Sequence, residues 1–210
     1  MNKMKLAVFD FDSTLMDGET LEFLASEMNC QKEVREITSR AMRGEADFFE
    51  SLRERVYLLK GLSEKKVNEI CENLPVMTGA KETVQELKKL NYKVVCFSGG
   101  FRNATVPFAQ KFGLDGEFSN VLHTKNGILT GFLGGEMMFN NSKGIMLQKL
   151  QKLLNVELGC TMAIGDGAND LSMFKYAGIK VSFCGKPVLE EAADIKIKNK
   201  DLREILKYIN

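Results

Sequence analysis

Three short apolar runs of this chain end in small, hydroxyl-bearing or acidic residues. Asp10 and Asp12 follow the first run, in the segment Asp-Phe-Asp-Ser-Thr, and Ser98 follows the second, in Ser-Gly-Gly-Phe. Asp166 and Asp170 follow a later run, in Gly-Asp-Gly-Ala-Asn-Asp. Such residues are common in loops and helix caps, so each segment alone has a purely structural interpretation. Together they indicate one polar site assembled from distant parts of the chain.

Lys143 lies between the second and third of these segments, at the start of a helical pattern. Four aspartates in one crevice would repel one another, because two like charges ~4 Å apart repel by roughly 4 kcal/mol at an effective dielectric of ~20. Oxygen ligands without Cys or His select a hard dication, and Mg²⁺ held by carboxylates and a substrate phosphate is the usual solution. The sequence therefore predicts a Mg²⁺ site beside Lys143 that takes an anionic substrate.

The residue composition argues against several other kinds of catalytic site. His123 is the only histidine, which nearly excludes Ser-His-Asp or Cys-His catalysis and multi-histidine metal sites. It precedes a predicted hairpin turn, and we assign it no role. The five cysteines are scattered and never spaced as Cys-x-x-Cys, so they predict ordinary thiols in a reducing cytosol. They are Cys30, Cys71, Cys96, Cys160 and Cys184.

Charge and hydropathy favour a cytoplasmic protein with a small-molecule substrate. Lys and Arg number 29 against 28 Asp and Glu, a formal charge of +1 with no basic stripe, which disfavours nucleic acid as a partner. Every apolar run is too short to span a bilayer. The first residues lack the stretch of about seven apolar residues that an export signal needs.

The elements that must position the polar segments follow from hydrophobic periodicity. Residues 5–9 are apolar without alternation, which predicts a buried parallel strand. Residues 20–71 show helical spacing throughout, enough for four helices and too much for one crossover, so a small helical bundle is expected. From residue 80 onward helices and strands alternate, which indicates a doubly wound, mainly parallel α/β sheet.

Ligands bind such sheets outside the carboxyl ends of the strands, where the polar segments fall. We expect an α/β core over residues 1–16 and 76–210, a helical cap over 17–75, and a small β-hairpin insertion over 121–139 with a type I′ turn at Asn126-Gly127. Further strands are expected at 93–97, 161–164, 179–183 and 193–197, and further helices at 80–90, 101–112, 146–154 and the C-terminus.

With these segments in this order, the chain resembles the haloacid dehalogenase superfamily, and within it the phosphoserine phosphatases. The resemblance covers essentially the whole chain, including Glu19 and the 42–59 stretch of the cap. It implies a Rossmann-like core and Mg²⁺-dependent hydrolysis of O-phospho-L-serine to serine and phosphate, the last step of serine biosynthesis. Dehalogenases proper lack an acid at the position of Asp12, so its presence favours phosphoryl chemistry.

The resemblance also implies roles for the polar residues. Asp10 would be the nucleophile that forms an aspartyl-phosphate. Asp12 would be the general acid and then the general base. The metal would be held by the side chains of Asp10 and Asp166 and by the backbone carbonyl of Asp12, with Asn169 and Asp170 acting through water or from behind these ligands.

Substrate contacts follow from the same resemblance. Ser98, Gly99, Gly100, Lys143 and Asn169 would surround the phosphoryl group. Glu19 would pair with the ammonium of phosphoserine and Arg55 with its carboxylate, by charge and by a bidentate fork. Met42 and Phe48 would form the apolar side of the pocket. The alternatives are two solvated helix charges for Glu19 and Arg55 and ordinary core packing for Met42 and Phe48.

Three other functions remain open at this point. A phosphotransferase would keep the aspartyl-phosphate and pass the phosphoryl group to a hydroxyl such as that of homoserine. A different phosphatase would act on a sugar phosphate or a nucleotide. A non-enzymatic sensor of phosphorylated ligands would normally carry a damaged motif, and Asp10, Asp12, Lys143 and Asp166 are all in place.

Overall fold

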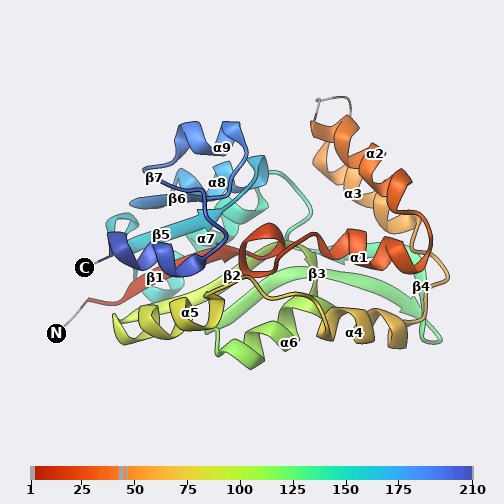
Figure 1. The fold of residues 1–210 in the computed structure, drawn as a ribbon, viewed down its shortest axis with the longest axis horizontal. Helices are drawn as coiled ribbons and strands as arrows, with labels where there is room; N and C mark the ends of the chain where they lie inside the picture. The colour runs from red at the N-terminus through yellow and green to blue at the C-terminus, as the bar shows by residue number, and fades with distance from the viewer. Residues whose placement is uncertain (1–2, 43–44, 46, 210) are drawn as a thin grey trace.

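One twisted sheet runs through the molecule in the computed structural model, which describes residues 3–42, 45 and 47–209 (Figure 1). Its seven described strands are ordered β4-β3-β2-β1-β5-β6-β7, and of these β4 alone is antiparallel to its neighbour. The predicted fold class, a doubly wound and mainly parallel α/β sheet, is confirmed. The strands are β1 (Lys5–Asp10), β2 (Tyr92–Phe101), β3 (Gly116–Lys125), β4 (Ile128–Gly135), β5 (Thr161–Gly165), β6 (Ile179–Phe183) and β7 (Ile195–Ile197).

Strand β1 lies at the centre because its side chains are apolar on both faces. Ala7 and Phe9 belong to one hydrophobic cluster, and Leu6 and Val8 to the other, and all four are fully buried. Burial on both faces is what a strand without polar alternation requires.

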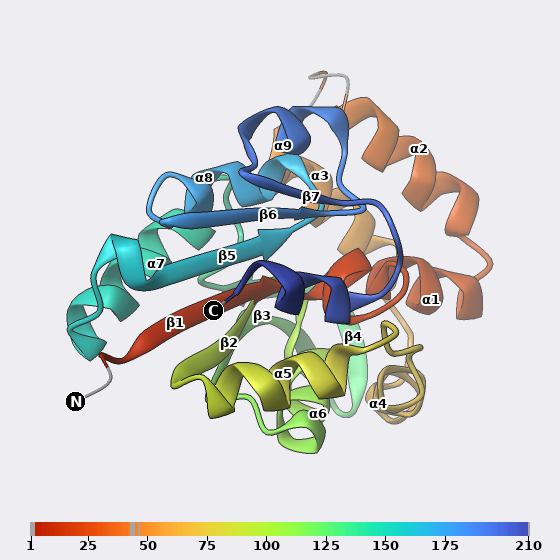
Figure 2. The ribbon, with the colours of Figure 1, turned by 60° about the vertical axis from the view of Figure 1, so that its left-hand side comes forward.

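Two layers of helices cover the sheet (Figure 2). Residues of α5 (Ala80–Lys89), α6 (Arg102–Phe112) and the C-terminal segment pack into the first cluster, and residues of α7 (Ser142–Leu154), α8 (Leu171–Phe174) and α9 (Pro187–Ala192) into the second. The expected C-terminal α-helix is instead a 3₁₀ segment, Leu202–Tyr208. Leu202 and Ile205, three residues apart, are both buried there, which suits the threefold repeat of a 3₁₀ helix.

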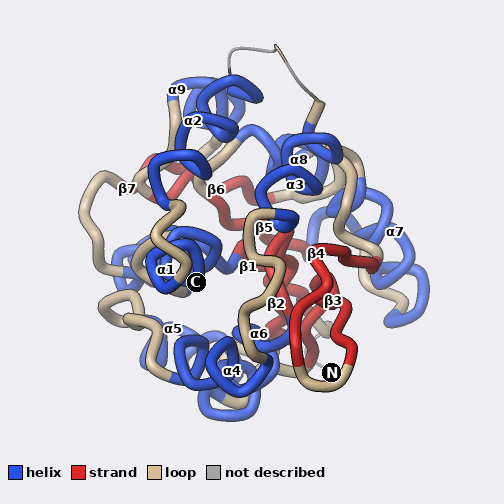
Figure 3. Tube along the Cα trace, turned by 90° about the vertical axis from the view of Figure 1, so that its right-hand side faces the viewer, coloured by secondary structure: helices blue, strands red, loops and turns tan. Residues whose placement is uncertain are grey.

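Four helices lie between β1 and α5 in the described part of the chain, as predicted. They are α1 (Thr20–Glu27), α2 (Gln31–Met42), α3 (Phe48–Tyr57) and α4 (Glu64–Glu72). They lie at the end of the molecule opposite both termini, the end toward which β1 runs (Figure 1). Helix α3 packs on β4 and α4 packs on α6, so these helices are attached at two places (Figure 3). This arrangement places them beside the carboxyl ends of the central strands.

Two strands extend further than the sequence indicates. β2 continues through Ser98 to Phe101, and its register with β3 shifts between Phe97 and Phe101. Such an irregularity lets polar loop residues stay attached to a sheet. β3 begins at Gly116 and pairs in parallel with β2, so the expected hairpin continues the main sheet. The turn between β3 and β4 has positive φ at both Asn126 (52°) and Gly127 (74°), as a type I′ turn requires.

The remaining global features are simple. All five cysteines are free thiols. Over the residues that the structure describes, none of the helices combines the length and apolar character needed to cross a membrane.

Candidate active site

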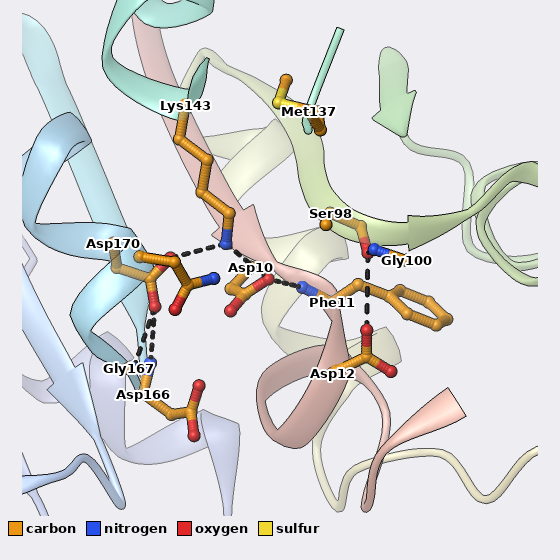
Figure 4. Close-up of polar contacts among 12 residues, drawn as sticks. Asp10, Phe11, Asp12, Ser98, Gly100, Met137, Lys143, Asp166, Gly167 and Asp170 are labelled. Carbon is orange, nitrogen blue, oxygen red and sulfur yellow. Dashed lines mark hydrogen bonds and ion pairs between the residues drawn. The ribbon is translucent and has the colours of Figure 1, made fainter. Parts of the chain in front are cut away.

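The site lies where the strand order reverses direction. β1 has β2 on one side and β5 on the other, so the carboxyl ends of three adjacent parallel strands meet there. Asp10 ends β1, Ser98 lies near the end of β2, and Asp166 follows β5 directly. The topology therefore brings together polar segments that are more than sixty residues apart in the chain (Figure 4).

Lys143 is the cation at the centre of this group. It lies in the first turn of α7, is only 3% exposed, and its Nζ lies 2.6 Å from both Asp10 Oδ1 and Asp170 Oδ1. Burial by itself lowers the pKa of Lys143, but the two carboxylates outweigh it and hold this pKa above its ordinary value. The ammonium is therefore permanently charged.

Three carboxylates converge beside that ammonium, and two of them contact it directly. Asp10, Asp166 and Asp170 each offer an oxygen, and these oxygens all lie within 4.8 Å of one another. Burial, followed by repulsion from Asp170, raises the pKa of Asp10 well above its ordinary range and that of Asp166 to about 6. When all three are ionised, their three negative charges against the one positive charge of Lys143 leave a net charge of −2. A hard divalent cation fits both this charge and this all-oxygen donor set.

The three carboxylates differ in how many of their oxygens are already engaged. Asp170 Oδ1 accepts from Lys143, and its Oδ2 accepts from the backbone N–H groups of Asp166 and Gly167, both at 3.0 Å. Asp10 Oδ1 accepts from Phe11 N–H at 2.7 Å and from Lys143, whereas its Oδ2 has no donor among the described residues. Asp170 thus braces the loop, while Asp10 keeps one oxygen available for a ligand.

Asp12 is held by a different set of partners. The chain turns sharply at Ser13 (φ 57°), and Asp12 Oδ1 accepts from both the N–H (2.7 Å) and the hydroxyl (2.6 Å) of Thr20. Its Oδ2 lies 3.5 Å from Ser98 Oγ. Burial raises the pKa of Asp12, and the bonds from Thr20 oppose this in part. Thr20, which sequence reasoning missed, therefore orients this carboxylate from the first residue of α1.

The end of β2 places the hydroxyl of Ser98 opposite Asp12. Ser98 is fully buried, and its Oγ accepts from the N–H of Gly100 at 2.9 Å. A Cβ at position 100 would lie 3.0 Å from both Asp12 Oδ2 and Ser98 Oγ, so a glycine lets the chain pass between them. Phe48 of α3 reaches the same place, with its Cζ 3.1 Å from where a Cβ on Gly99 would lie.

Glu19 and Arg55 carry opposite charges, and both belong to the segment between β1 and α5. Glu19 precedes α1 and is exposed; its Oε1 accepts from Ser13 Oγ at 2.9 Å. Desolvation by the surrounding protein, followed by repulsion from Asp12 and Asp166, raises the pKa of Glu19 to about 7. Burial lowers the pKa of Arg55, opposed by attraction to Glu19. Arg55 Nε donates to the carbonyl of Ser51 at 3.1 Å. Within the described ranges no carboxylate lies within ion-pair distance of Arg55, so its two Nη groups are open to a ligand.

The other predicted residues are placed less directly. Asn169 is half-buried in the 3₁₀ turn Ala168–Asp170, and its Oδ1 lies 2.7 Å from where a Cβ on Gly167 would be. Met42 ends α2, but its side chain lies outside the described residues. His123 is exposed and bonded through Nδ1 to the hydroxyl of Thr130, away from this site. Asn120 of β3, another residue that sequence reasoning missed, bonds to Gly99 and is considered below.

Comparison with known proteins agrees with this geometry. Residues 4–178 match the family model of haloacid dehalogenase-like hydrolases. The chain is 59% identical over 206 residues to the phosphoserine phosphatase of Wolinella succinogenes, covering 98% of this chain and 100% of that protein. It is 49% identical over 207 residues to the phosphoserine phosphatase of Methanocaldococcus jannaschii, covering 99% and 98%.

Solved structures show the same relationship. A phospho-aspartyl intermediate analogue of phosphoserine phosphatase matches with a TM-score of 0.95 and 49% identity, over 99% of this chain and 100% of that one. A substrate-bound phosphoserine phosphatase complex matches with a TM-score of 0.95 and 48% identity, over 100% of both chains.

The excess negative charge of Asp10, Asp166 and Asp170 predicts that a divalent cation stabilises the folded protein. Added MgCl₂ at about 100-fold its Kd should stabilise the fold by about 2.7 kcal/mol, which raises Tm by roughly 5–10 °C for a chain of this size. Asp166→Asn should abolish most of this shift in a thermal melt. Asp194→Asn, an exposed carboxylate paired with Lys180, is the matched control and should keep it. An equal shift in both variants would place the cation elsewhere.

Proposed function

The chain belongs to the haloacid dehalogenase-like hydrolase family, and from this premise we propose that it hydrolyses O-phospho-L-serine to L-serine and phosphate through an aspartyl-phosphate on Asp10. The observation that carries the mechanism is the state of the Asp10 carboxylate. One oxygen is fixed by Lys143 and Phe11 N–H, and the other is free to attack phosphorus. The substrate follows from the relatives of similar length that are phosphoserine phosphatases. This reaction completes serine biosynthesis.

Mg²⁺ is the proposed cofactor. The carboxylates of Asp10 and Asp166 and the backbone carbonyl of Asp12 would hold it, with Asn169 acting through water. Asp170 would support them from behind, because both of its oxygens are already engaged. The ion supplies positive charge that offsets the net −2 of the acidic group and the charge of the phosphoryl oxygens.

The reaction then needs two displacements at phosphorus. In the first, Asp10 Oδ2 attacks in line, the bond from phosphorus to the serine oxygen breaks, and Asp12 gives its proton to that oxygen. In the second, Asp12 takes a proton from water, the water oxygen attacks phosphorus, and the bond to Asp10 breaks to release phosphate. Ser98, the N–H of Gly99 and Lys143 stabilise charge on the phosphoryl oxygens in both steps.

Residues 17–75 would act as a cap over a core formed by residues 1–16 and 76–210, with the hairpin of residues 121–139 as part of the attachment. Glu19 would bind the ammonium of phosphoserine and Arg55 its carboxylate. Phe48, which contacts Gly99, would form the apolar wall, and Met42 stays a prediction beside it. The free thiols suit a cytoplasmic location, which also stays a prediction.

The central test is phosphate release from phosphoserine with Asp10 intact and replaced. The wild type should release phosphate, EDTA should abolish release, and Asp10→Asn should fold normally but lose at least ~10³-fold in kcat, because the amide cannot form the acyl-phosphate. Threonine phosphate and a sugar phosphate serve as comparison substrates. Near-normal turnover by Asp10→Asn would remove this residue from the mechanism. Serine release that exceeds phosphate release when homoserine is added would indicate a phosphotransferase, because the phosphoryl group then passes to homoserine.

The role of Arg55 predicts a substrate-dependent effect. Arg55→Ala should raise KM for phosphoserine roughly 10- to 100-fold, the worth of a charge-assisted hydrogen-bond pair. It should leave KM for phosphoethanolamine, which lacks the carboxylate, nearly unchanged. Arg53→Ala on the same helix, whose side chain lies over the Phe49 ring, is the matched control. Equal losses for both substrates would contradict the assignment.

The raised pKa of Glu19 predicts a pH dependence. Below pH about 7 this carboxyl is protonated and cannot attract the substrate ammonium, so kcat/KM for phosphoserine should fall as pH drops through about 7. Phosphoglycerate carries a hydroxyl in place of the ammonium but shares the phosphate ionisation. The ratio of the two kcat/KM values should therefore rise with pH and level off above 7, and Glu19→Gln should flatten it. A flat ratio in the wild type would exclude this role.

A further inference from the structure

We propose that Asn120 is a positioning residue for the phosphoryl transfer described above, acting through Ser98. Its side-chain amide orients the peptide unit that holds the Ser98 hydroxyl and ties that peptide to the segment leading into Lys143. This inference rests on the proposed function for the identity of the reaction. The contacts that carry it are independent of the substrate.

The side chain of Asn120 is buried and fully engaged. It lies in β3, is 0% exposed, and its Nδ2 donates to the carbonyl of Gly99 (3.0 Å) and to that of Met137 (3.3 Å). Its Oδ1 accepts from the N–H of Met137 at 3.0 Å. An amide buried in a strand is unfavourable unless its bonds are satisfied, so an apolar residue would serve packing alone at least as well. The polar contacts therefore point to a role beyond filling the core.

The bond to Gly99 sets the direction of one peptide unit. The Gly99 carbonyl and the Gly100 N–H belong to the same trans peptide and point in opposite directions. With the carbonyl held by Asn120, the N–H is aimed at Ser98 Oγ, which accepts it at 2.9 Å. Because Ser98 Oγ accepts this bond, its own proton is directed outward, toward Asp12 Oδ2 at 3.5 Å and toward a bound phosphoryl oxygen.

The bonds to Met137 connect the same amide to the chain that delivers Lys143. Met137 is buried, and the segment after it closes into α7 through bonds between Phe139 and Ser142, immediately before Lys143. In the view of Figure 4, Met137 lies between Lys143 and Ser98. One amide thus spans the two segments whose polar groups would contact the same phosphoryl group, and it fixes their separation.

The β3–β4 hairpin packs closely against the side-chain amide of Asn120. Gly135 of β4 is the cross-strand partner of Asn120 and has φ 148°, a backbone conformation that side chains rarely adopt. A Cβ there would lie 2.5 Å from Asn120 Oδ1 and 2.7 Å from its Cα. Strands β3 and β4 therefore approach closely at this pair, and the amide is held against rotation.

The test is a double-mutant cycle with Ser98, because a residue that acts through Ser98 should lose its effect when the hydroxyl is absent. Asn120→Ala should lower kcat ~10- to 100-fold and raise KM for phosphoserine by no more than the ~10-fold expected for phosphate binding, since Glu19 and Arg55 still bind the rest of the substrate. In the Ser98→Ala background the same change should cost less than ~3-fold. Additive losses, or an unchanged kcat, would overturn the proposal.

Two further variants separate positioning from stability. Thr105→Val removes bonds to Glu117, Ser119 and the carbonyl of Phe101 at an equally buried position, and none of these partners is one of the site residues. It should lower Tm while leaving kcat unchanged. If Asn120→Ala does not fold, Asn120→Asp keeps the shape and the acceptor for Met137 N–H but loses the donor to Gly99, and it enters the same cycle with the same expected result.

A binding readout makes the test independent of turnover on phosphoserine. The affinity for inorganic phosphate in the presence of Mg²⁺, measured by calorimetry, should fall ~10-fold in Asn120→Ala and hardly change when Ser98 is already alanine. If the wild type binds phosphate in this pattern but does not hydrolyse phosphoserine, the proposed substrate is wrong and the role of Asn120 stands. If the pattern is additive, the role of Asn120 is wrong whatever the substrate.

Discussion

The pairing of one buried ammonium with two of three converging carboxylates is the interaction on which the site depends. Lys143 loses its hydration on burial, and only the direct contacts with Asp10 and Asp170 compensate for this cost. The contacts also fix which acids stay available, because Asp170 is then fully engaged while Asp10 and Asp166 still face the crevice. With all three acids ionised, the remaining charge of −2 fits a dication, and the proposed dication would in turn let a phosphate enter an acidic pocket.

The topology of the sheet makes this pairing possible. Since β1 lies between β2 and β5, three strand ends supply Asp10, Ser98 and Asp166 on rigid backbone, and α7 brings Lys143 from one face. The four helices inserted after β1 supply the opposite charges of Glu19 and Arg55 and the ring of Phe48. In the proposed function, the catalytic groups and the substrate-recognition groups would thus come from different parts of the chain and meet at the end of β2.

Much of this arrangement was predictable from the sequence, because it depends on local patterns. Apolar runs without alternation predicted the central strands, and the polar residues after each run marked the site. The extent of β2 and β3 was not predictable, since Ser-Gly-Gly has no strand preference and stays in the sheet only through its irregular pairing with β3. The parts played by Thr20 and Asn120 were missed for a related reason. Each acts through a bond to a residue far away in the chain, and nothing in the adjacent sequence marks it.

Asp10 and Asp12 are similar acidic groups, but they bind partners of different charge. This difference separates the roles proposed for them. Burial raises the pKa of both Asp10 and Asp12, so position alone would not distinguish them. Asp10 is bonded to a permanent cation, which favours its ionised form and suits a nucleophile. Asp12 accepts from the neutral N–H and hydroxyl of Thr20 through Oδ1, which leaves its Oδ2 directed toward Ser98, as the proposed acid that protonates the leaving oxygen requires. The proposed division of roles would therefore be set by α1 and α7, the elements that supply Thr20 and Lys143, rather than by β1, which both acids end or follow.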